Sequence, residues 1–268
     1  MIGLITGASG GVGRVLASTL ATHGMTVYGT MRDPSRADPD LPFRMLAMEV
    51  TDAASVQRCV QEVLDREGRI DVLINCVNQM IIGGFDEQTP EEVQSLYDTN
   101  VFGMLRICQA VVPSMRERGE GLVITMSSLG GLVAVPYMSA YTSAKFALEA
   151  LSEALYHELR PHGVDVMILQ PVAMHMDRPA TGSHLRLVDG VRDGSPSHRV
   201  LDRMESDTEA SRLTPEAVAK KVLALIQRRR RPLRVPMDRA VVLGMAKRVL
   251  PQAFVDRLVD DFVGKGTR

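Results

Sequence analysis

The sequence predicts an α/β fold: a single doubly wound parallel sheet of about seven strands, with helices on both faces. Short apolar runs alternate along the chain with segments whose apolar residues recur every three or four positions, which predicts strands alternating with helices. Glycine-rich or polar residues follow several of these runs, and the carboxyl ends of parallel strands meet at one edge of a sheet. No linker-like stretch divides the 268 residues, so we expect one domain over residues 1–268.

The first 23 residues predict a strand, a glycine-rich turn and a helix. The apolar run Ile2–Thr6 stops at a glycine cluster, and Val12–His23 carries apolar residues at helical spacing. The turn, Thr-Gly-x-x-x-Gly-x-Gly, lets backbone approach a pyrophosphate at a helix N-terminus, where free N–H groups and the helix dipole favour anions. A glycine cluster alone also fits a plain turn, but its place between strand and helix favours a Rossmann-like dinucleotide site. The predicted contacts are Gly7, Ser9, Gly11, Val12 and Gly13.

The residues after the second predicted strand, Met25–Thr30, select the cofactor because the adenosine ribose lies beyond the end of this strand. An acid at this place favours NAD. This chain has Met31 followed by Arg32, whose guanidinium can pair with a 2′-phosphate. We therefore predict a preference for NADP(H) over NAD(H). The alternative is that Arg32 ends a strand in solvent.

The middle of the chain continues the alternation of strands and helices. Thr89-Pro90 followed by two acids is a helix-start signal. Met80–Gly84 is expected to be an apolar loop that faces a ligand or the core. The remaining predicted elements before residue 120 are strands at Phe43–Val50 and Ile70–Asn75 and helices at Ala53–Glu67 and Asn100–Arg118.

One predicted helix, Ala140–Arg160, carries the candidate acid–base chemistry. Its apolar residues recur at helical spacing, so Tyr141 and Lys145 share one face. A free phenol, with a pKa of about 10, is a poor acid–base catalyst near neutral pH. An ammonium at about 4 Å and an effective dielectric near 20 supplies roughly 4 kcal/mol, or about three pKa units, so we expect Lys145 to lower the pKa of Tyr141. Ser128, at the end of an apolar run, is placed to hydrogen-bond the same substrate oxygen. The spacing alone also fits a packed Tyr beside a solvated Lys.

The last third of the chain predicts a strand, a long irregular region and a helical end. Val164–Leu169 and Leu233–Pro236 are predicted strands, and Thr214 starts a helix. The substrate-loop region is placed at residues 173–213, where 180–213 shows little periodicity, with Leu185, Leu187 and Val188 as lid contacts. Residues 237–264 are predicted to be a helical segment.

Composition excludes several classes of partner. The 31 basic and 32 acidic residues give no reason to expect nucleic acid. Cys59, Cys76 and Cys108 are scattered and form no CxxC pair, which is typical of a reduced cytosolic protein, and we predict no metal site. A strand-like run follows Met1 at once, and no apolar run approaches the roughly eighteen residues of a membrane span. We therefore expect neither a signal peptide nor an integral membrane segment, and a cytoplasmic protein.

These motifs together resemble the short-chain dehydrogenase/reductase family across roughly the whole chain. Ser128 lies thirteen residues before Tyr141, Asn100 lies in Thr-Asn-Val-Phe-Gly, and the glycine turn precedes both. The amino-acid sequences of residues 28–33 and 135–149 are most similar to the hydroxysteroid and retinol dehydrogenase branch. The resemblance implies a catalytic tetrad of Asn100, Ser128, Tyr141 and Lys145, in which Asn100 holds a water beside Lys145 and Lys145 binds the nicotinamide ribose. It also implies a homodimer or homotetramer, and nucleotide contacts from Glu49, Val50, Asn75 and Pro171.

Two loops depart from the family pattern. Relatives have Asn-Asn-Ala-Gly where this chain has Asn75-Cys76-Val77-Asn78, which puts larger side chains where backbone passes the cofactor. Relatives have Pro-Gly, often with Thr four places after the Gly, where this chain has Pro171, Val172 and Met176. The departures motivate two alternative functions on the same fold: a nucleotide-responsive binding protein, or a redox-neutral enzyme that uses Tyr141 as an acid.

The favoured function is an NADP(H)-dependent oxidoreductase that interconverts a secondary alcohol and a ketone. Apolar residues predicted around the site favour a large apolar substrate of the steroid, retinoid, acyl or polyketide type, because methionine-rich surfaces adapt to irregular shapes. The predicted lining is Met80, Leu129, Val135, Tyr137, Met138 and Met174.

Overall fold

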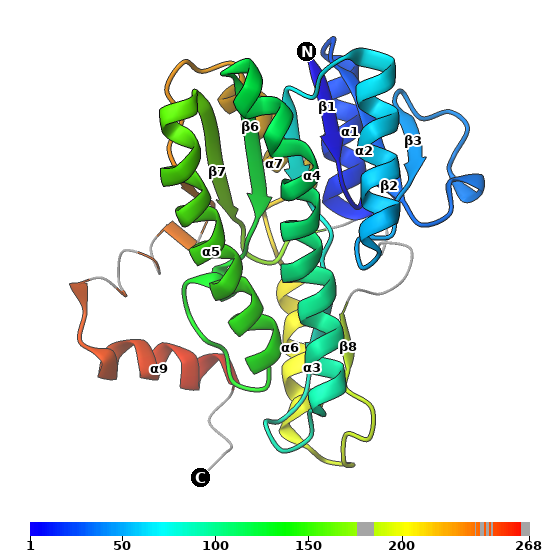
Figure 1. Ribbon diagram of the computed structural model, residues 1–268. Helices are drawn as coiled ribbons and strands as arrows, with labels where there is room; N and C mark the ends of the chain where they lie inside the picture. The colour runs from blue at the N-terminus through cyan, green and yellow to red at the C-terminus, as the bar shows by residue number, and fades with distance from the viewer. Residues whose placement is uncertain (176–184, 239, 242–243, 245–246, 248, 264–268) are drawn as a thin grey trace.

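A central sheet of seven parallel strands runs through the molecule in the order β3-β2-β1-β4-β6-β7-β9 (Figure 1). The structure, a computed structural model, describes residues 1–175, 185–238, 240–241, 244, 247 and 249–263. The strands of the sheet are β1 (Ile2–Ile5), β2 (Thr26–Met31), β3 (Arg44–Ala47), β4 (Val72–Asn75), β6 (Gly121–Met126), β7 (Val164–Gln170) and β9 (Arg234–Pro236). The predicted doubly wound parallel sheet is confirmed, although β3 and β4 are shorter than the apolar runs that predicted them.

Helices cover both faces of this sheet. Three helices, α2 (Ala53–Glu67), α4 (Gly103–Arg118) and α5 (Ser139–Leu159), contribute to one apolar core cluster, whereas α1 (Gly11–Thr22) and α7 (Pro215–Ile226) contribute to a second. Within β1, Leu4 belongs to the first cluster and its neighbour Ile5 to the second, because successive strand residues point to opposite faces. A sheet buried on both faces explains why its strands are continuous apolar runs in the sequence.

A smaller unit lies beyond the carboxyl edge of the sheet and corrects two predictions. The predicted loop Met80–Gly84 contains a strand, β5 (Met80–Ile82), which pairs in parallel with β8 (Leu185–Leu187). The region 180–213, predicted to be irregular, contains β8 and a helix, α6 (Pro196–Glu209). Three-residue strands show no measurable period, and their partners lie about a hundred positions away in the sequence. The helix α6 is largely polar, but Val200, Leu201 and Met204 form a narrow apolar face that the prediction of an irregular region missed.

The predicted helix Asn100–Arg118 is the second part of a longer, interrupted helix. The helix α3 (Pro90–Tyr97) begins at the predicted signal, with Thr89 and Glu92 forming a capping box. A π-helical turn, Asp98–Phe102, separates α3 from α4 and contains Asn100. Single π turns inside helices occur frequently at functional sites, and this one contains the candidate residue Asn100.

The remaining elements are short turns and the helical end of the chain. The 3₁₀ turns are Pro34–Arg36, Leu129–Gly131 and Arg160–His162, and the last helix is α9 (Gln252–Val263). Within 237–264, the described residues 240, 241, 244, 247 and 249 are also helical. Over the part of the chain that the structure describes, none of the helices combines the length and apolarity that crossing a membrane requires.

Candidate active site

The sheet topology brings the candidate residues to one edge. The strand order reverses between β1 and β4, which lie side by side, and open α/β sheets bind ligands at the carboxyl end of such a switch point. Gly7 follows β1, Asn75 ends β4 and Ser128 follows β6. Residues separated by more than a hundred positions therefore meet at this edge.

The glycine turn has the geometry that close backbone approach requires. The φ angle is 68° at Gly7 and 53° at Gly11, in the left-handed region that favours glycine. A Cβ atom at Gly13 would lie 2.3 Å from the carbonyl oxygen of Gly7, so no larger residue fits there. The α1 helix begins at Gly11 with no side chain capping its first N–H groups. These donors fit the pyrophosphate of a dinucleotide.

The other predicted nucleotide contacts surround this turn. Met31 ends β2, and its carbonyl oxygen accepts a hydrogen bond from the Met48 amide at 2.9 Å. Arg32 is exposed, and its guanidinium makes no ion pair among the described residues. The Glu49 carboxylate accepts from the Thr51 amide at 3.1 Å and the Thr51 hydroxyl at 3.0 Å, so it is turned back onto its own chain. An open guanidinium after β2 fits a 2′-phosphate.

The altered loop after β4 closes against the glycine turn. A hydroxyl–amide hydrogen bond of 3.1 Å joins Thr6 to Cys76, and a Cβ atom at Gly7 would lie 3.1 Å from the Val77 amide nitrogen. The Cys76 side chain is buried in the second core cluster, and Val77 packs against the first. Val77 replaces the Ala of the family pattern, whereas Asn78 replaces the Gly and leaves its Oδ1 buried without a hydrogen-bond partner among the described residues.

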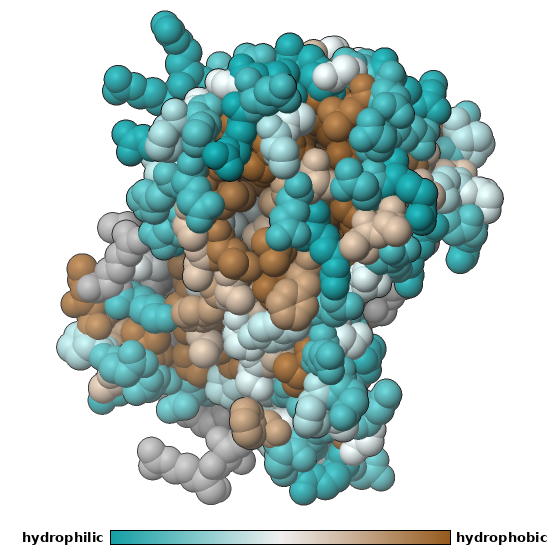
Figure 2. All heavy atoms as spheres, in the orientation of Figure 1, coloured by the Kyte–Doolittle hydropathy of each residue, from teal (hydrophilic) through white to brown (hydrophobic). Residues whose placement is uncertain are grey.

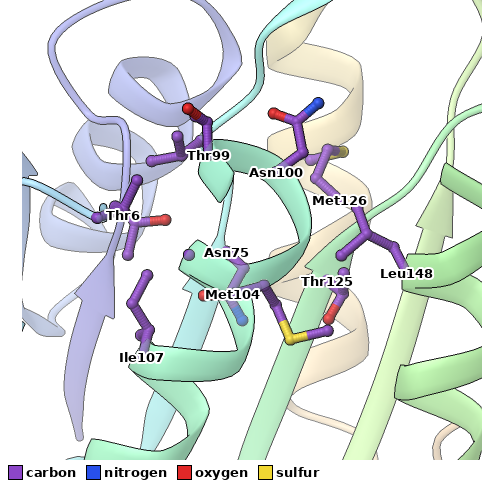
Figure 3. A pocket seen from close by; sticks show the side chains of 12 residues that line it. Thr6, Asn75, Thr99, Asn100, Met104, Ile107, Thr125, Met126 and Leu148 are labelled. Carbon is purple, nitrogen blue, oxygen red and sulfur yellow. The ribbon is translucent and has the colours of Figure 1, made fainter. Parts of the chain in front are cut away.

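A small cavity of about 10 Å³, the room that a single water needs, lies beneath the site, between β1, β4, β6 and α4 (Figure 3). Thr6, Asn75, Asn100 and Thr125 provide polar groups in its lining. The Asn75 amide nitrogen lies 3.7 Å from the Cys108 sulfur, and its Oδ1 is buried without a hydrogen-bond partner among the described residues. A buried polar atom of this kind usually has a partner, so Oδ1 is available to a donor that enters the cavity.

Ser128, Tyr141 and Lys145 come together between β6 and α5. The Ser128 hydroxyl lies near the Tyr141 phenol and lowers its pKa, and it accepts a hydrogen bond from the Gly130 amide at 3.1 Å. The Lys145 ammonium lies 5.6 Å from the centre of the Tyr141 ring. Both Tyr141 and Lys145 are buried, at 5% and 1% exposure. The spacing in the sequence thus identified a set of side chains that are in mutual contact or within one helical turn.

The expected effect of Lys145 on the pKa of Tyr141 is wrong for this structure. Burial raises the pKa of Tyr141 to about 12, and the hydrogen bond from Ser128 opposes this only in part. The ammonium of Lys145 instead donates to the Met126 carbonyl oxygen at 2.9 Å, and it faces the ring of Tyr141. A spacing of four in the sequence shows neither the burial of the pair nor the free-energy cost of burying a charged phenolate.

Lys145 itself is perturbed by its surroundings. Burial lowers the pKa of its ammonium to about 8, while Cys76 and Glu149 act in the opposite direction. Burial also raises the pKa of the Cys76 thiol to about 12. A lysine with this pKa changes its charge close to physiological pH.

Asn100 has a positioning contact that its sequence motif did not indicate. Its Oδ1 accepts from the Gln79 amide at 2.7 Å, and its Nδ2 donates to the Gln79 carbonyl oxygen at 2.7 Å. Both polar atoms of the side chain therefore fix the segment between β4 and β5. A water held by Asn100 beside Lys145 stays a prediction.

The predicted substrate-pocket residues divide into three groups. Met138 is buried in a third apolar cluster that also contains Tyr141, and Met80, Val135 and Tyr137 pack against that cluster. Met174 packs instead against the second core cluster. Leu129 lies in the 3₁₀ turn after Ser128, where its amide donates to the Pro171 carbonyl oxygen at 2.9 Å. Met176 lies outside the described residues.

A buried carboxylate beside the candidate centre was missed in the sequence. Glu149 is 6% exposed and accepts from Gln170 Nε2 at 2.9 Å and from Arg234 Nε at 2.9 Å. Its spacing of four from Lys145 places it one turn further along α5, and this spacing was a usable signal. Arg234 lies on β9, 85 positions away, and nothing local in the sequence connects the two.

Comparison with known proteins decides the family. The family model described as short chain dehydrogenase matches residues 2–181. The chain belongs to the short-chain dehydrogenase family. Members of this family are oxidoreductases. The resemblance to this family that the sequence predicted is confirmed.

Several members of this family are similar to the chain over much of its length. A 3-ketodihydrosphingosine reductase of Bacteroides thetaiotaomicron is 42% identical over 168 residues, which are 63% of this chain and 62% of that relative, so less than two thirds of the relative is spanned. Human 17-beta-hydroxysteroid dehydrogenase type 1 is 32% identical over 243 residues, 84% of this chain and 73% of the relative. The hydroxysteroid branch is thus among the similar proteins, as predicted.

Solved structures agree with the fold. The crystal structure of a short-chain dehydrogenase from Streptomyces avermitilis has a TM-score of 0.84 and 30% identity, covering 100% of this chain and 98% of that one. A short chain dehydrogenase from Burkholderia cenocepacia, solved in complex with NADP, shares the fold, with a TM-score of 0.78, 22% identity, and 97% of each chain covered.

Proposed function

We propose that the protein is an NADP(H)-dependent oxidoreductase that interconverts a secondary alcohol and a ketone on an apolar substrate. The observation that carries this proposal is the convergence of the Ser128 hydroxyl and the Tyr141 phenol, with the Lys145 ammonium 5.6 Å from the phenol ring. This convergence lies at the sheet edge that also holds the glycine turn. Oxygen donors next to a dinucleotide site suit a carbonyl that becomes an alkoxide.

The side chains divide the work of ketone reduction. Bound nicotinamide supplies the hydride that the carbonyl carbon receives. The Ser128 hydroxyl polarises the carbonyl oxygen, and the Tyr141 phenol, whose pKa of about 12 keeps it protonated near neutral pH, donates the proton that this oxygen needs. The Lys145 ammonium stabilises the phenolate left behind, and a proton from solvent restores the phenol. Alcohol oxidation runs these proton transfers in reverse.

The apolar character of the third cluster supports an apolar substrate. Met138, Ile81 and Val188 are buried beside Tyr141, and Met80 and Val135 pack against them. Two similar proteins are named for a ketodihydrosphingosine and for a hydroxysteroid, so both names carry a ketone or alcohol on a largely apolar frame. We propose substrates of this kind and test one of each.

The test of the proposal is consumption of NADPH with a panel of ketones. We expect steady absorbance loss at the nicotinamide band with 3-ketodihydrosphingosine or a 17-ketosteroid, and no loss with a matched hydrocarbon that lacks the ketone. Nucleotide binding without turnover of any ketone would favour the nucleotide-responsive binding protein. Absence of binding in a fluorescence titration would favour the redox-neutral acid–base enzyme.

The cofactor preference follows from Arg32, and we propose that the chain prefers NADP(H). A guanidinium–phosphate hydrogen bond is worth about 1.5–3 kcal/mol, or roughly tenfold to a hundredfold in affinity. We expect Met31→Asp combined with Arg32→Ala to shift the NADPH/NADH ratio of kcat/KM by at least about tenfold toward NADH. Arg58→Ala, which removes an arginine whose side chain is 72% exposed, serves as the control for loss of charge. An unaltered ratio would place the ribose pocket elsewhere.

A homodimer or homotetramer is proposed through the outer faces of α4 and α5. Leu105 and Phe146 on these helices are each 38% exposed, and Phe102, just before α4, is 46% exposed. Figure 2 shows apolar side chains gathered over this part of the surface. Large apolar side chains exposed together on two adjacent helices suit contact with a second copy. The buried free thiols Cys59, Cys76 and Cys108 support a reducing, cytoplasmic setting.

A further inference from the structure

A segment that contains no candidate catalytic residue packs directly against the catalytic tyrosine. Residues 185–209, named here the covering unit, comprise β8, the following turn and α6. Val188 and Val200 of this unit belong to the same apolar cluster as Ile81, Met138 and Tyr141. The covering unit therefore packs in the same apolar cluster as Tyr141. Figure 1 shows β8 and α6 beyond the carboxyl edge of the central sheet.

The buried carboxylate of Glu87 joins α6 of the covering unit to the body of the protein, while Glu92 accepts from the Asp189 amide at 2.8 Å. The Glu87 side chain is only 3% exposed, although it lies in the connection between β5 and α3. Its Oε2 accepts from the Ser197 hydroxyl of α6 at 2.7 Å and from the Gly84 amide at 2.7 Å. Its Oε1 lies 3.7 Å from Nε of Arg192, which is also in the covering unit. Glu87 thus connects two segments that are 110 positions apart.

The same short connection continues to the start of the catalytic helix. The Gly83 amide donates to the Tyr137 carbonyl oxygen at 2.8 Å. Gln88 Nε2 donates to the Gly83 carbonyl oxygen at 2.6 Å and to the hydroxyl of Ser139, the first residue of α5, at 3.0 Å. Tyr137 has a φ of 62°, which a side chain other than glycine adopts only where its surroundings hold it. A continuous chain of contacts therefore runs from α6 through Glu87 to the residues preceding Tyr141.

Gly83 shows how closely the covering unit is seated. A Cβ atom at this position would lie 2.4 Å from Cγ2 of Val188. The Val188 amide also donates to the Ile82 carbonyl oxygen at 2.9 Å. A small displacement of the covering unit would therefore open the apolar wall beside Tyr141.

We propose that Glu87 is a positioning residue that seats the covering unit against Tyr141 and thereby sets the affinity of the site for the apolar part of the substrate. The proposal rests on the proposed function, in which the ketone is bound at Tyr141. Glu87 acts through Ser197 and Gly84, so its loss loosens the wall of the pocket and leaves the proton donors in place.

The Glu87 carboxylate keeps its charge and its hydrogen bond to Ser197 over the whole physiological pH range. The hydrogen bond from Ser197 is the main reason that the pKa of Glu87 falls to about 2, against an ordinary value of 4.5. A carboxyl whose pKa is depressed by folding contributes stability above its ordinary value and loses it as the pH falls through about 2. The contact is therefore a fixed one between pH 5 and 9, and effects of its removal are expected to be independent of pH in that range.

The experiment compares Glu87→Gln, Ser197→Ala and the double variant with Asp86→Asn as matched control. Asp86 is the adjacent acid and also pairs with Arg192, at 2.6 Å, but both side chains are about 70% exposed. We expect Glu87→Gln to raise KM for the ketone about tenfold, with kcat changed less than about threefold and the Kd for NADPH unchanged. Ser197→Ala is expected to raise KM as well. The double variant is expected to have the KM of Glu87→Gln, because the two substitutions affect the same hydrogen bond. Asp86→Asn is expected to leave all three constants unchanged.

Amide hydrogen exchange of the full chain separates this proposal from the proposed function. Faster exchange confined to residues 185–209 in Glu87→Gln, and absent in Asp86→Asn, is the result expected whether or not a ketone is turned over. Unchanged exchange in 185–209, or an equal fall in kcat and in NADPH affinity with no change in KM, would overturn the proposal. Failure of the unaltered protein to reduce any ketone would instead contradict the proposed function. If Glu87→Gln does not fold, Ser197→Ala carries the same comparison.

Discussion

Tyr141→Phe is expected to lower the kcat for ketone reduction by about a thousandfold while leaving the Kd for NADPH within about twofold. The substitution removes the phenolic hydroxyl that meets Ser128 and keeps the ring, which is packed in the third apolar cluster. General acid catalysis typically contributes about a hundredfold to ten-thousandfold, and the expected loss lies within this range. The measurement is kcat at saturating ketone, with nucleotide affinity followed by fluorescence.

The control for this prediction lies on the same helix. Tyr156→Phe removes a phenolic hydroxyl from a partly buried tyrosine that packs against the first core cluster, away from Ser128. We expect this variant to retain the activity of the unaltered protein. Equal rates for Tyr141→Phe and Tyr156→Phe would mean that the proton of the alcohol comes from another group.

Lys145→Met is expected to have the second largest effect, a fall in kcat of about a hundredfold or more near neutral pH. The side chain of methionine fills a similar space, but it removes the charge beside the Tyr141 ring and the hydrogen bond to the Met126 carbonyl oxygen. Because the pKa of Lys145 is about 8, the ammonium is present below this pH and disappears above it. For the unaltered protein we expect ketone reduction to be level below about pH 8 and to fall above it.

Stability provides an independent check on the same lysine. Burial lowers the pKa of Lys145 from the ordinary 10.5 to about 8, so the unfolded chain binds more protons between these values. The free energy of unfolding should therefore rise with pH across this window, and below pH 8 the buried ammonium costs stability. Lys145→Met should abolish this rise, whereas Lys220→Met, at an exposed position on α7, should preserve it. A pH profile of kcat that is the same in both variants would remove Lys145 from the mechanism.

Local sequence patterns predicted those features that depend on neighbouring residues. The glycine turn was predictable because its spacing, its positive φ angles and the following helix all lie within residues 6–22. Tyr141 and Lys145 share a helix, so a spacing of four was enough to bring them to one face. The parallel sheet followed from the alternation of apolar runs, because the central strands are buried on both faces.

Other features had no local signal. The β5–β8 pair joins three-residue strands about a hundred positions apart, and the polar helix α6 takes its place through Glu87 and Ser197. Glu87 lies in a turn with Asp86, and the two acids look alike in the sequence although one is buried and the other exposed. A charged side chain is buried only where hydrogen-bond partners surround it. For Glu87 one of these partners, Ser197, comes from a distant segment, so its neighbours in the sequence do not indicate its burial.

The sequence by itself determined the doubly wound sheet, the glycine turn and the order of Ser128, Tyr141 and Lys145, because helical and strand periods act over a few residues. Only the tertiary structure decided the electrostatics of that group. It buries Tyr141, which raises the pKa of the phenol, and directs the Lys145 ammonium to the Met126 carbonyl oxygen. It also seats residues 185–209 on Glu87. Desolvation and long-range hydrogen bonds arise only when distant segments pack together. The sequence therefore named the candidate groups, and the fold set their pKa values and their surroundings.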